Sequence, residues 1–459
     1  MKYQSTRGRA PILGFEETVL AGLARDGGLY VPTELPHLDA GTLADLRGRS
    51  YEDVALRVML PFTDLDETRL GDMIEAAYAG FGHAARAPLV QIDADQWLLE
   101  LFHGPTLAFK DFAMQFIGQV FQDAMKRRGD RLTIVGATSG DTGSAAIEAF
   151  RGLDNVECFI LLPEGRVSEV QRRQMTTPTE PNVHAIAVDG DFDDCQALVK
   201  AMFNDHAFRD RVNLTAVNSI NWARVLAQSV YYVSSAVALG APERSVSYTV
   251  PTGNFGDIFA GDLARRMGVP IDRLVIATNR NDILHRTMET GEHRKEGVAP
   301  TISPSMDIQV SSNFERALFR AYDEDGNAVA QLMEELSSEG GFSISQGAMG
   351  ALREVYRSGC ASEEETAATI RSIYARTGEV LCPHTAVGVK VATEHRGETP
   401  MVTLATAHPA KFPDAVEAAT GSRPALPPRM ADLFERPERI TTVPNALDAL
   451  KTLIEETLF

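Results

Sequence analysis

The sequence predicts an α/β protein in which parallel sheets are covered by helices on both faces. From about residue 95 onward, short runs rich in β-branched residues alternate with helical stretches. Two of these runs end in glycine-rich turns that open directly into a helix. Such strand–loop–helix units are typical of parallel strands joined by crossover helices. The 459 residues are enough for two or three domains with a sizeable core.

The expected strands are the apolar runs 132–135, 156–162, 184–188, 246–250, 274–277 and 401–405. Helices are expected at residues 144–150 and from the turn after residue 250 through Met267. The stretch 225–242 carries no formal charge but contains a glutamine, several serines and two tyrosines. Its length and polarity predict a buried helix rather than a membrane span.

The chain divides into three expected portions. Residues 1–95 look more helical and are punctuated by proline and glycine, so we expect a separate, mainly helical N-terminal portion. A smaller α/β domain is expected at 96–240 and a larger one at 241–459. The sequence contains no internal repeat and no low-complexity linker.

The net charge of −19 argues against a nucleic-acid binder and against docking on anionic membranes. An anionic ligand must therefore be bound locally, by backbone amides and a few basic groups. The cysteines lie far apart without a Cys-x-x-Cys pair, which argues against a structural metal or disulfide framework; they are Cys158, Cys195, Cys360 and Cys382. We expect no metal and a reducing, cytoplasmic location, because the N-terminus also lacks the apolar core of a signal peptide.

Lys110 is the one lysine of residues 101–121, and Phe109, Phe112 and Phe116 recur beside it at helical spacing. A lysine beside such a buried stripe is desolvated, which lowers its pKa and favours the neutral amine that condenses with carbonyl groups. Alternatively, Lys110 pairs with Asp111 or with a more distant acid at the edge of the stripe. Spacing alone favours the second reading, and phosphate sites elsewhere in the chain would favour the first.

Two glycine-rich turns, 138–143 and 252–257, each follow an expected strand and open a helix. Free N–H groups and the helix dipole make such a position an anion site. Neither turn matches the Walker pattern Gly-x-x-x-x-Gly-Lys-Ser/Thr or the dinucleotide pattern Gly-x-Gly-x-x-Gly. Glycine turns also join strands to helices for structural reasons alone. Together with a buried lysine, the two turns indicate one phosphate on a cofactor and another on a substrate.

Two further polar features suit the same ligands. Residues 218–224 place two amides, a hydroxyl and the Arg224 guanidinium in one stretch, which suits a phosphate ester but also fits a helix cap with a solvated face. Thr406 follows the expected strand 401–405, at the sheet edge where ligands of parallel sheets gather. His384 and His408 are expected to be structural, and Thr385 is expected to cap a helix.

The sequence resembles the threonine synthase family, in the branch found in many bacteria and fungi. The resemblance rests on motifs spread in order over nearly the whole chain: 3–8, 22–32, 103–112, 136–143, 218–224, 251–257, 383–388 and 405–412. It implies a fold-type II pyridoxal-phosphate architecture, with two α/β domains and the cofactor between them.

The resemblance also implies roles for individual residues. Lys110 matches the Schiff-base lysine that carries pyridoxal 5′-phosphate (PLP), and Thr406 matches a hydroxyl residue beside the pyridine nitrogen. Asp141 stands where another branch has an asparagine near the cofactor's O3′. The loop that holds the cofactor phosphate is matched by Gly253, Asn254, Phe255 and Asp257. Substrate-binding positions are matched by Thr138, Ser139, Thr142, Asn218, Ser219 and Arg224. Cys382 departs from the expected aspartate, which leaves its role open.

The implied reaction converts O-phospho-L-homoserine and water to L-threonine and phosphate, by γ-elimination and β-addition of water. The alternative on the same scaffold is a phospho-lyase or β-replacement enzyme acting on another phosphorylated or β-substituted amino acid. A non-catalytic binding protein that retains the fold is a different class, disfavoured by the complete set of motifs. A small-molecule substrate, no nucleic acid, no membrane and a monomer or weak homo-oligomer are the expected partners.

Overall fold

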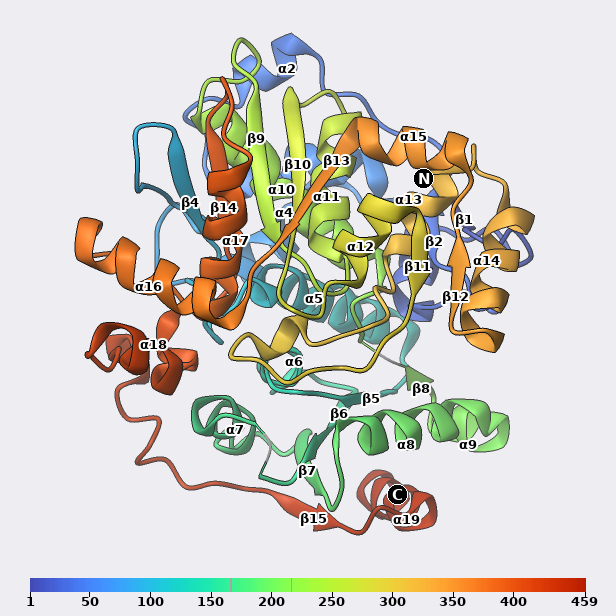
Figure 1. Ribbon diagram of the computed structural model, residues 1–459. Coiled ribbons are helices and arrows are strands. Elements are labelled where there is room, and N and C mark those ends of the chain that lie inside the picture. Colours follow the sequence, from blue (N-terminus) through green and yellow to red (C-terminus); the bar gives the residue numbers. More distant parts are fainter. Residues whose placement is uncertain (166, 216) are drawn as a thin grey trace.

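The larger of two main sheets has six strands. The computed structural model describes residues 1–165, 167–215 and 217–459, and Figure 1 shows the arrangement of its elements. The strand order is β13-β10-β9-β14-β4-β3, and all neighbours are parallel except the edge pair β4–β3. In that order the strands are Tyr356–Cys360, Ile271–Thr278, Val246–Pro251, Met401–Ala405, Gln96–Glu100 and Leu89–Gln91.

The smaller sheet is parallel throughout, with the order β15-β7-β6-β5-β8. Its strands are Thr441–Val443, Val183–Val188, Val156–Pro163, Leu132–Ala137 and Leu214–Thr215. The predicted α/β class with parallel sheets is thus confirmed, and each of the six expected strands lies within an observed one.

Helices cover both faces of the larger sheet, as the alternation along β10 demonstrates. Leu274 and Ile276 pack into the core shared with α10 and α11, whereas Val275 and Ala277 pack with Val387 of α17 on the opposite face. The surrounding helices are α5 (Lys110–Arg128), α10 (Trp222–Ala238), α11 (Gly256–Arg266), α12 (Ile283–Thr290), α16 (Glu363–Thr377), α17 (Pro383–Glu394) and α18 (Pro413–Thr420).

Helices also cover both faces of the smaller sheet. In β5, Ile134 packs toward the core shared with α5 and α6, and Val135 packs toward α8 on the other face. Its helices are α6 (Asp141–Phe150), α7 (Glu169–Thr176), α8 (Phe192–Asn204), α9 (His206–Arg211) and α19 (Leu447–Leu458). Figure 1 shows α5 and α6 lying between the two sheets.

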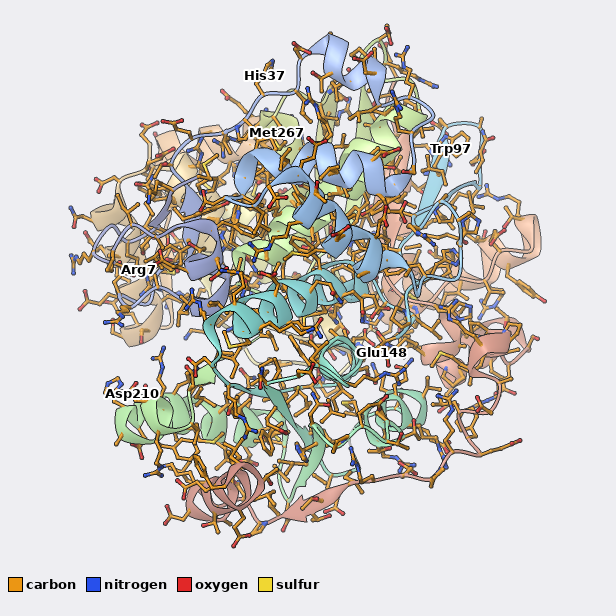
Figure 2. All side chains as sticks on the ribbon, turned by 180° about the vertical axis from the view of Figure 1, so that it is seen from behind. Arg7, His37, Trp97, Glu148, Asp210 and Met267 are labelled. Carbon is orange, nitrogen blue, oxygen red and sulfur yellow. The ribbon has the colours of Figure 1, made fainter. Side chains whose placement is uncertain are left out.

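The N-terminal portion is mainly helical, as predicted, and lies against the larger sheet's helices. It comprises β1 (Tyr3–Ser5), α1 (Phe15–Ala21), β2 (Tyr30–Pro32), α2 (Ala40–Asp45), α3 (Tyr51–Met59) and α4 (Glu67–Tyr78). The backbone N–H of Leu38 donates to Met267 O at 2.6 Å, next to His37, and Figure 2 shows this contact region from behind. A further unit beside β2 contains β11 (Glu292–Arg294), α13 (Phe314–Ala321), α14 (Gly326–Ser338), β12 (Gly341–Ser343) and α15 (Gln346–Val355).

The chain crosses between the two sheets more often than the boundaries at residues 96 and 241 allow. β4 lies in the portion expected to form the smaller domain, yet it pairs with β14 in the larger sheet. β15, expected in the larger domain, pairs with β7 in the smaller one, and Figure 1 shows α19 beside it. Strand pairing is set by long-range packing, which a linear division of the sequence does not reveal.

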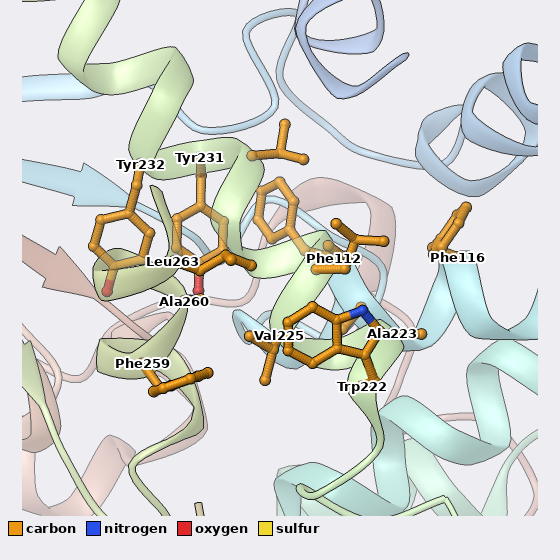
Figure 3. Packing of buried hydrophobic residues seen from close by; sticks show 14 of the residues in the cluster. Phe112, Phe116, Trp222, Ala223, Val225, Tyr231, Tyr232, Phe259, Ala260 and Leu263 are labelled. Atoms are coloured by element: carbon orange, nitrogen blue, oxygen red, sulfur yellow. The ribbon is translucent and has the colours of Figure 1, made fainter. Parts of the chain in front are cut away.

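The uncharged stretch after residue 224 is a buried helix, as predicted. Within α10, Tyr231 and Tyr232 are fully buried, and Figure 3 shows them packed near Phe112 and Phe259. Trp222 lies at the start of the same helix, fully buried. Over the described residues, every helix is too short or too polar to cross a bilayer.

Candidate active site

Lys110 is the first residue of α5 and lies at the carboxyl end of the larger sheet. The loop before it is tied to the end of β14, because Phe109 N donates to Thr406 O at 2.9 Å and Ala108 forms a β-bridge with Ala407. This pairing brings the candidate lysine and the candidate pyridine-nitrogen partner Thr406 together. Both side chains are buried.

The Asp141 carboxylate is the centre of a buried polar cluster. Lys411 Nζ lies 2.7 Å from its Oδ1, and Lys110 Nζ lies 3.5 Å from its Oδ2. Gln171 Nε2 and Ser305 Oγ donate to it at 2.9 and 3.3 Å. Burial alone would raise the pKa of Asp141, but the charges of Lys411 and Lys110 outweigh it and hold that pKa well below its usual range. Asp141 is therefore an anion at neutral pH.

Lys110 pairs with this distant acid and not with its neighbour Asp111. Asp111 instead accepts hydrogen bonds from the backbone N–H and the hydroxyl of Thr106, at 2.8 and 2.6 Å. Burial lowers the pKa of Lys110 to about 8, assisted by the nearby Arg224 and Lys411 charges and opposed by Asp141. A lysine with this pKa supplies a useful fraction of neutral amine near neutral pH.

The turn 252–257 is a candidate anion cradle at the start of α11. Among the described residues, no backbone N–H of residues 253–258 donates a hydrogen bond within the protein. Phe255 adopts a left-handed conformation with φ 64°, which turns the chain into the helix. A Cβ on Gly253 would lie 2.9 Å from Ser305 O, so only glycine fits beside that loop. Free N–H groups at a helix start are a fitting site for a phosphate.

The carboxylate of Asp257 is hydrogen-bonded within the protein and is not a free group in this turn. Its Oδ1 accepts hydrogen bonds from the hydroxyls of Tyr231 and Tyr232, at 2.5 and 3.0 Å. Burial raises the pKa of Asp257 to about 7, partly offset by the two tyrosine hydrogen bonds and by Arg224. Asp257 therefore offers its backbone N–H at the helix start, while its side chain belongs to the α10–α11 interface.

The second turn, 138–143, opens α6 in the smaller domain. The Thr138 hydroxyl accepts the backbone N–H groups of Gly140 and Gly143, at 3.0 and 2.8 Å. Among the described residues, the N–H groups of Ser139, Asp141 and Thr142 donate to nothing within the protein. Thr138 thus shapes the loop, and the three free N–H groups make it a second candidate anion site.

The cluster 218–224 divides into a cap and a free cation. Asn221 caps α10, since its side chain accepts from Ala223 N and donates to Val19 O. Asn218 is exposed and Ser219 half-buried. Arg224 is 3% exposed, and its guanidinium has no hydrogen-bond or ion-pair partner among the described residues. Burial lowers the pKa of Arg224 to about 10. An anionic ligand would satisfy this buried cation.

Several site residues were not predicted from the sequence: Gln171, Ser305 and Lys411, all bonded to Asp141. Lys411 lies within residues 405–412, one of the motifs that carry the family resemblance. The motif did not indicate that Lys411 pairs with Asp141. His384 accepts the Ser305 N–H at 3.1 Å through Nε2, and burial lowers its pKa to about 4, so its ring is neutral. It supports the Ser305 loop, in keeping with the structural role expected for it.

The expected cap of α17 is wrong. The helix begins at Pro383, and the Cys382 sulfur accepts the Thr385 N–H at 3.5 Å. Thr385 is therefore the capped residue and Cys382 the cap. A thiol at this place provides the acceptor that an aspartate would otherwise supply.

Family models match nearly the whole chain. A threonine synthase N-terminal model matches residues 2–78, a pyridoxal-phosphate dependent enzyme model 82–354, and a threonine synthase C-terminal model 385–454. The chain is 53% identical to threonine synthase of Pseudomonas aeruginosa, with 99% of this chain and 98% of that protein covered. The chain belongs to the threonine synthase family. The resemblance stated from the motifs is confirmed.

Solved structures of the family share the fold over the full length. PLP-bound threonine synthase from Brucella melitensis has a TM-score of 0.98 and 56% identity, covering 100% of this chain and 99% of that one. Yeast threonine synthase has a TM-score of 0.94 and 39% identity, covering 100% and 98%. The fold-type II architecture expected from the motifs is thereby confirmed.

Proposed function

We propose that this protein is a PLP-dependent threonine synthase, converting O-phospho-L-homoserine and water to L-threonine and phosphate. The observation that carries the proposal is the convergence of a buried amine with two anion sites. Lys110 lies near the unpartnered guanidinium of Arg224, and the charge of Arg224 lowers the pKa of Lys110. The Nζ of Lys110 also contacts Asp141, the first residue of α6. Family membership supplies the reaction that needs this combination.

The residues present fit the cofactor. The free N–H groups at the start of α11 suit its phosphate, and we assign Gly253, Asn254, Phe255 and Asp257 to that role through their backbone. Lys110 Nζ provides the covalent attachment. Thr406 is assigned to the ring nitrogen and Asp141 to the side that carries O3′. When bound, PLP supplies an electron-accepting ring that stabilises negative charge at the substrate α-carbon.

Arg224 and the loop 138–143 together suit the substrate phosphate. We assign Arg224 to it, because its buried guanidinium lacks a partner within the protein. The N–H groups of Ser139 and Thr142, in the loop shaped by Thr138, are assigned to the same substrate, as are Asn218 and Ser219. The first site stays filled, and the second empties once per turnover when phosphate is released.

Lys110 is the proposed catalytic base and acid. Its pKa of about 8 lets Nζ accept the α-proton at neutral pH and return a proton later in the cycle. Asp141 stays ionised throughout, because Lys411 remains paired with it when Lys110 is engaged elsewhere. The burial of Lys110, Lys411 and Asp141 keeps bulk water from the reacting carbons.

Product analysis tests the function. The purified protein is incubated with PLP and O-phospho-L-homoserine, and the products are separated by chromatography. We expect threonine and inorganic phosphate in equal amounts. Release of 2-oxobutanoate and phosphate without threonine would instead identify a phospho-lyase on the same scaffold.

We propose a monomer or weak homo-oligomer in the cytoplasm. The four cysteines are all free, which suits a reducing compartment. Size-exclusion chromatography with light scattering checks the assembly, and a stable dimer at micromolar concentration would contradict it.

A further inference from the structure

Asn313 and Arg316 lie at the start of α13, and their side chains donate hydrogen bonds to the backbone of the turn 252–257 and of the segment 218–224. Their side chains are fully buried. Asn313 precedes the helix, and Arg316 follows one turn later. The guanidinium of Arg316 donates to the side-chain oxygen of Asn313, so the two side chains form one unit.

The Asn313 amide bridges two segments that are separate in sequence. Its Nδ2 donates to Ser219 O and to Asn254 O, each at 3.0 Å. Its backbone N–H also donates to Asn254 O at 3.0 Å. A single side chain therefore holds the turn 252–257 against the segment 218–224.

Arg316 extends the same unit to the N-terminal portion. It donates to Ile220 O at 2.7 Å and to Tyr30 O at 3.0 Å through Nη2, and again to Tyr30 O at 3.2 Å through Nε. The guanidinium also lies 5.7 Å from the centre of the Trp222 ring. The rigid guanidinium of Arg316 thus fixes the backbone at Ile220 and at Tyr30 relative to α13.

This guanidinium is kept in the core without an acidic partner. Among the described residues no carboxylate forms an ion pair with Arg316, and Glu315 next to it pairs with Arg7 instead. Burial lowers the pKa of Arg316 to about 9. Burying an unpaired cation is costly, and apolar side chains of similar size would fill the space more favourably. A positioning role accounts for its presence.

We propose that Asn313 and Arg316 form a clasp that sets the separation between the cofactor-phosphate turn 252–257 and the substrate-phosphate segment 218–224. They are positioning residues, since they contact backbone carbonyls of both segments. The identity of the two ligands rests on the proposed function, whereas the clasp itself rests on the hydrogen bonds. Because one amide holds both segments, disturbing it weakens both phosphate sites together.

The test uses Asn313→Asp, which keeps the size of the side chain and the acceptor for Arg316. It removes the Nδ2 donor and places an oxygen against the carbonyls of Ser219 and Asn254. We expect the Kd of PLP for the apoenzyme and the KM for O-phospho-L-homoserine each to rise about tenfold or more. The Kd of inorganic phosphate for the holoenzyme should rise by a similar factor, while kcat at saturation changes less.

Two matched variants separate the clasp from general damage. The Ser311 hydroxyl donates to Gly253 O at 2.7 Å, and this is its one hydrogen bond among the described residues, so Ser311→Ala should weaken PLP binding without a matching rise in the phosphate Kd. Asn327→Asp makes the same chemical change on the exposed side of α14 and should alter none of these constants. If Asn313→Asp does not fold, Arg316→Lys, which keeps the charge but loses the guanidinium, is measured in the same way.

A folded clasp variant that weakens only one of the two phosphate sites, or neither, overturns the proposal. Failure of the proposed function is distinguishable from this outcome. It would appear as a wild-type protein that forms no threonine, whereas the affinities for PLP and inorganic phosphate test the clasp without turnover.

Discussion

Lys411 Nζ lies 2.7 Å from the Asp141 carboxylate, closer than the 3.5 Å that separates Lys110 from the same group. Lys411 is fully buried and also donates to Thr106 O at 2.8 Å. Asp141 is therefore held as an anion by a lysine that forms no other ion pair among the described residues. Lys110, the looser partner, is left available for chemistry.

Replacing Lys411 by methionine tests this division of roles. The change leaves Asp141 buried with only the more distant cation, so we expect a loss of about 3–5 kcal/mol in the free energy of unfolding of the apoprotein. Denaturant titration measures it. Lys411→Arg, which keeps the charge, should lose less. Equal stability of wild type and Lys411→Met would contradict the pairing.

The reactivity of Lys110 should follow its lowered pKa. In the apoprotein, the rate of labelling by a small carbonyl reagent is expected to rise with pH with a midpoint near 8, as the amine loses its proton. The labelling rate is followed by mass spectrometry, and Lys110→Met should lose this phase. A midpoint near the ordinary lysine value of about 10.4 would contradict the burial effect.

The lowered pKa of Lys110 also makes the free energy of unfolding depend on pH. The folded-state pKa of Lys110 lies below its unfolded value, so between about pH 8 and 10.5 the unfolded chain binds more protons than the folded one. The contribution of Lys110 to stability therefore rises with pH across this window. Denaturant titrations of the apoprotein at several pH values should show a smaller rise for Lys110→Met than for wild type. Identical pH profiles would be inconsistent with a lowered pKa in the folded state.

We expect Arg224 to strengthen substrate binding while lowering the free energy of unfolding of the apoprotein. Removing an unpartnered buried charge in Arg224→Met is expected to leave the unfolding free energy of the apoprotein unchanged or higher. The KM for O-phospho-L-homoserine should rise about 100-fold, matching the loss of a charge-assisted phosphate contact. Steady-state kinetics and thermal unfolding check the two effects. A large loss of stability without a change in KM would assign Arg224 a structural role.

Gly140 is required by the conformation of the α6 loop. Its φ is 141°, and a Cβ there would lie 2.4 Å from the Gln171 side chain that donates to Asp141. Gly140→Ala should therefore lower the unfolding free energy by about 1–3 kcal/mol and reduce kcat. The control is Gly71→Ala in α4, where a Cβ meets open space and the helix should gain about 0.5–1 kcal/mol. Equal effects of the two substitutions would rule out the strain at Gly140.

Local patterns were enough to predict six of the strands and the glycine turns, whereas strands such as β4, β13 and β15 were not predicted. The apolar runs, such as 156–162, coincide with strands because a nearly continuous apolar run reflects burial on both faces. Lys110 stood out because its neighbours were aromatic, and the turn 252–257 because glycine there permits a phosphate to approach the backbone. The cofactor and the reaction came from the family resemblance.

Long-range partners were not predictable. The contact of Asp141 with Lys411 joins residues 270 apart in the chain, and nothing local in either segment specifies it. The Asp257 side chain accepts hydrogen bonds from tyrosines of α10. The sequence did not predict this, because the direction of a side chain at a helix start depends on the helix packed against it. The domain boundaries failed for the same reason, since β4 pairs with a strand some 300 residues later.

Reduction of the PLP-loaded protein with borohydride, followed by peptide mass analysis, tests the central assignment most directly. Two buried lysines flank Asp141, and only one of them can carry the cofactor. We predict that the visible absorbance disappears on reduction and that the phosphopyridoxyl label is found on Lys110. A label on Lys411, or on no lysine, would contradict the account of this site.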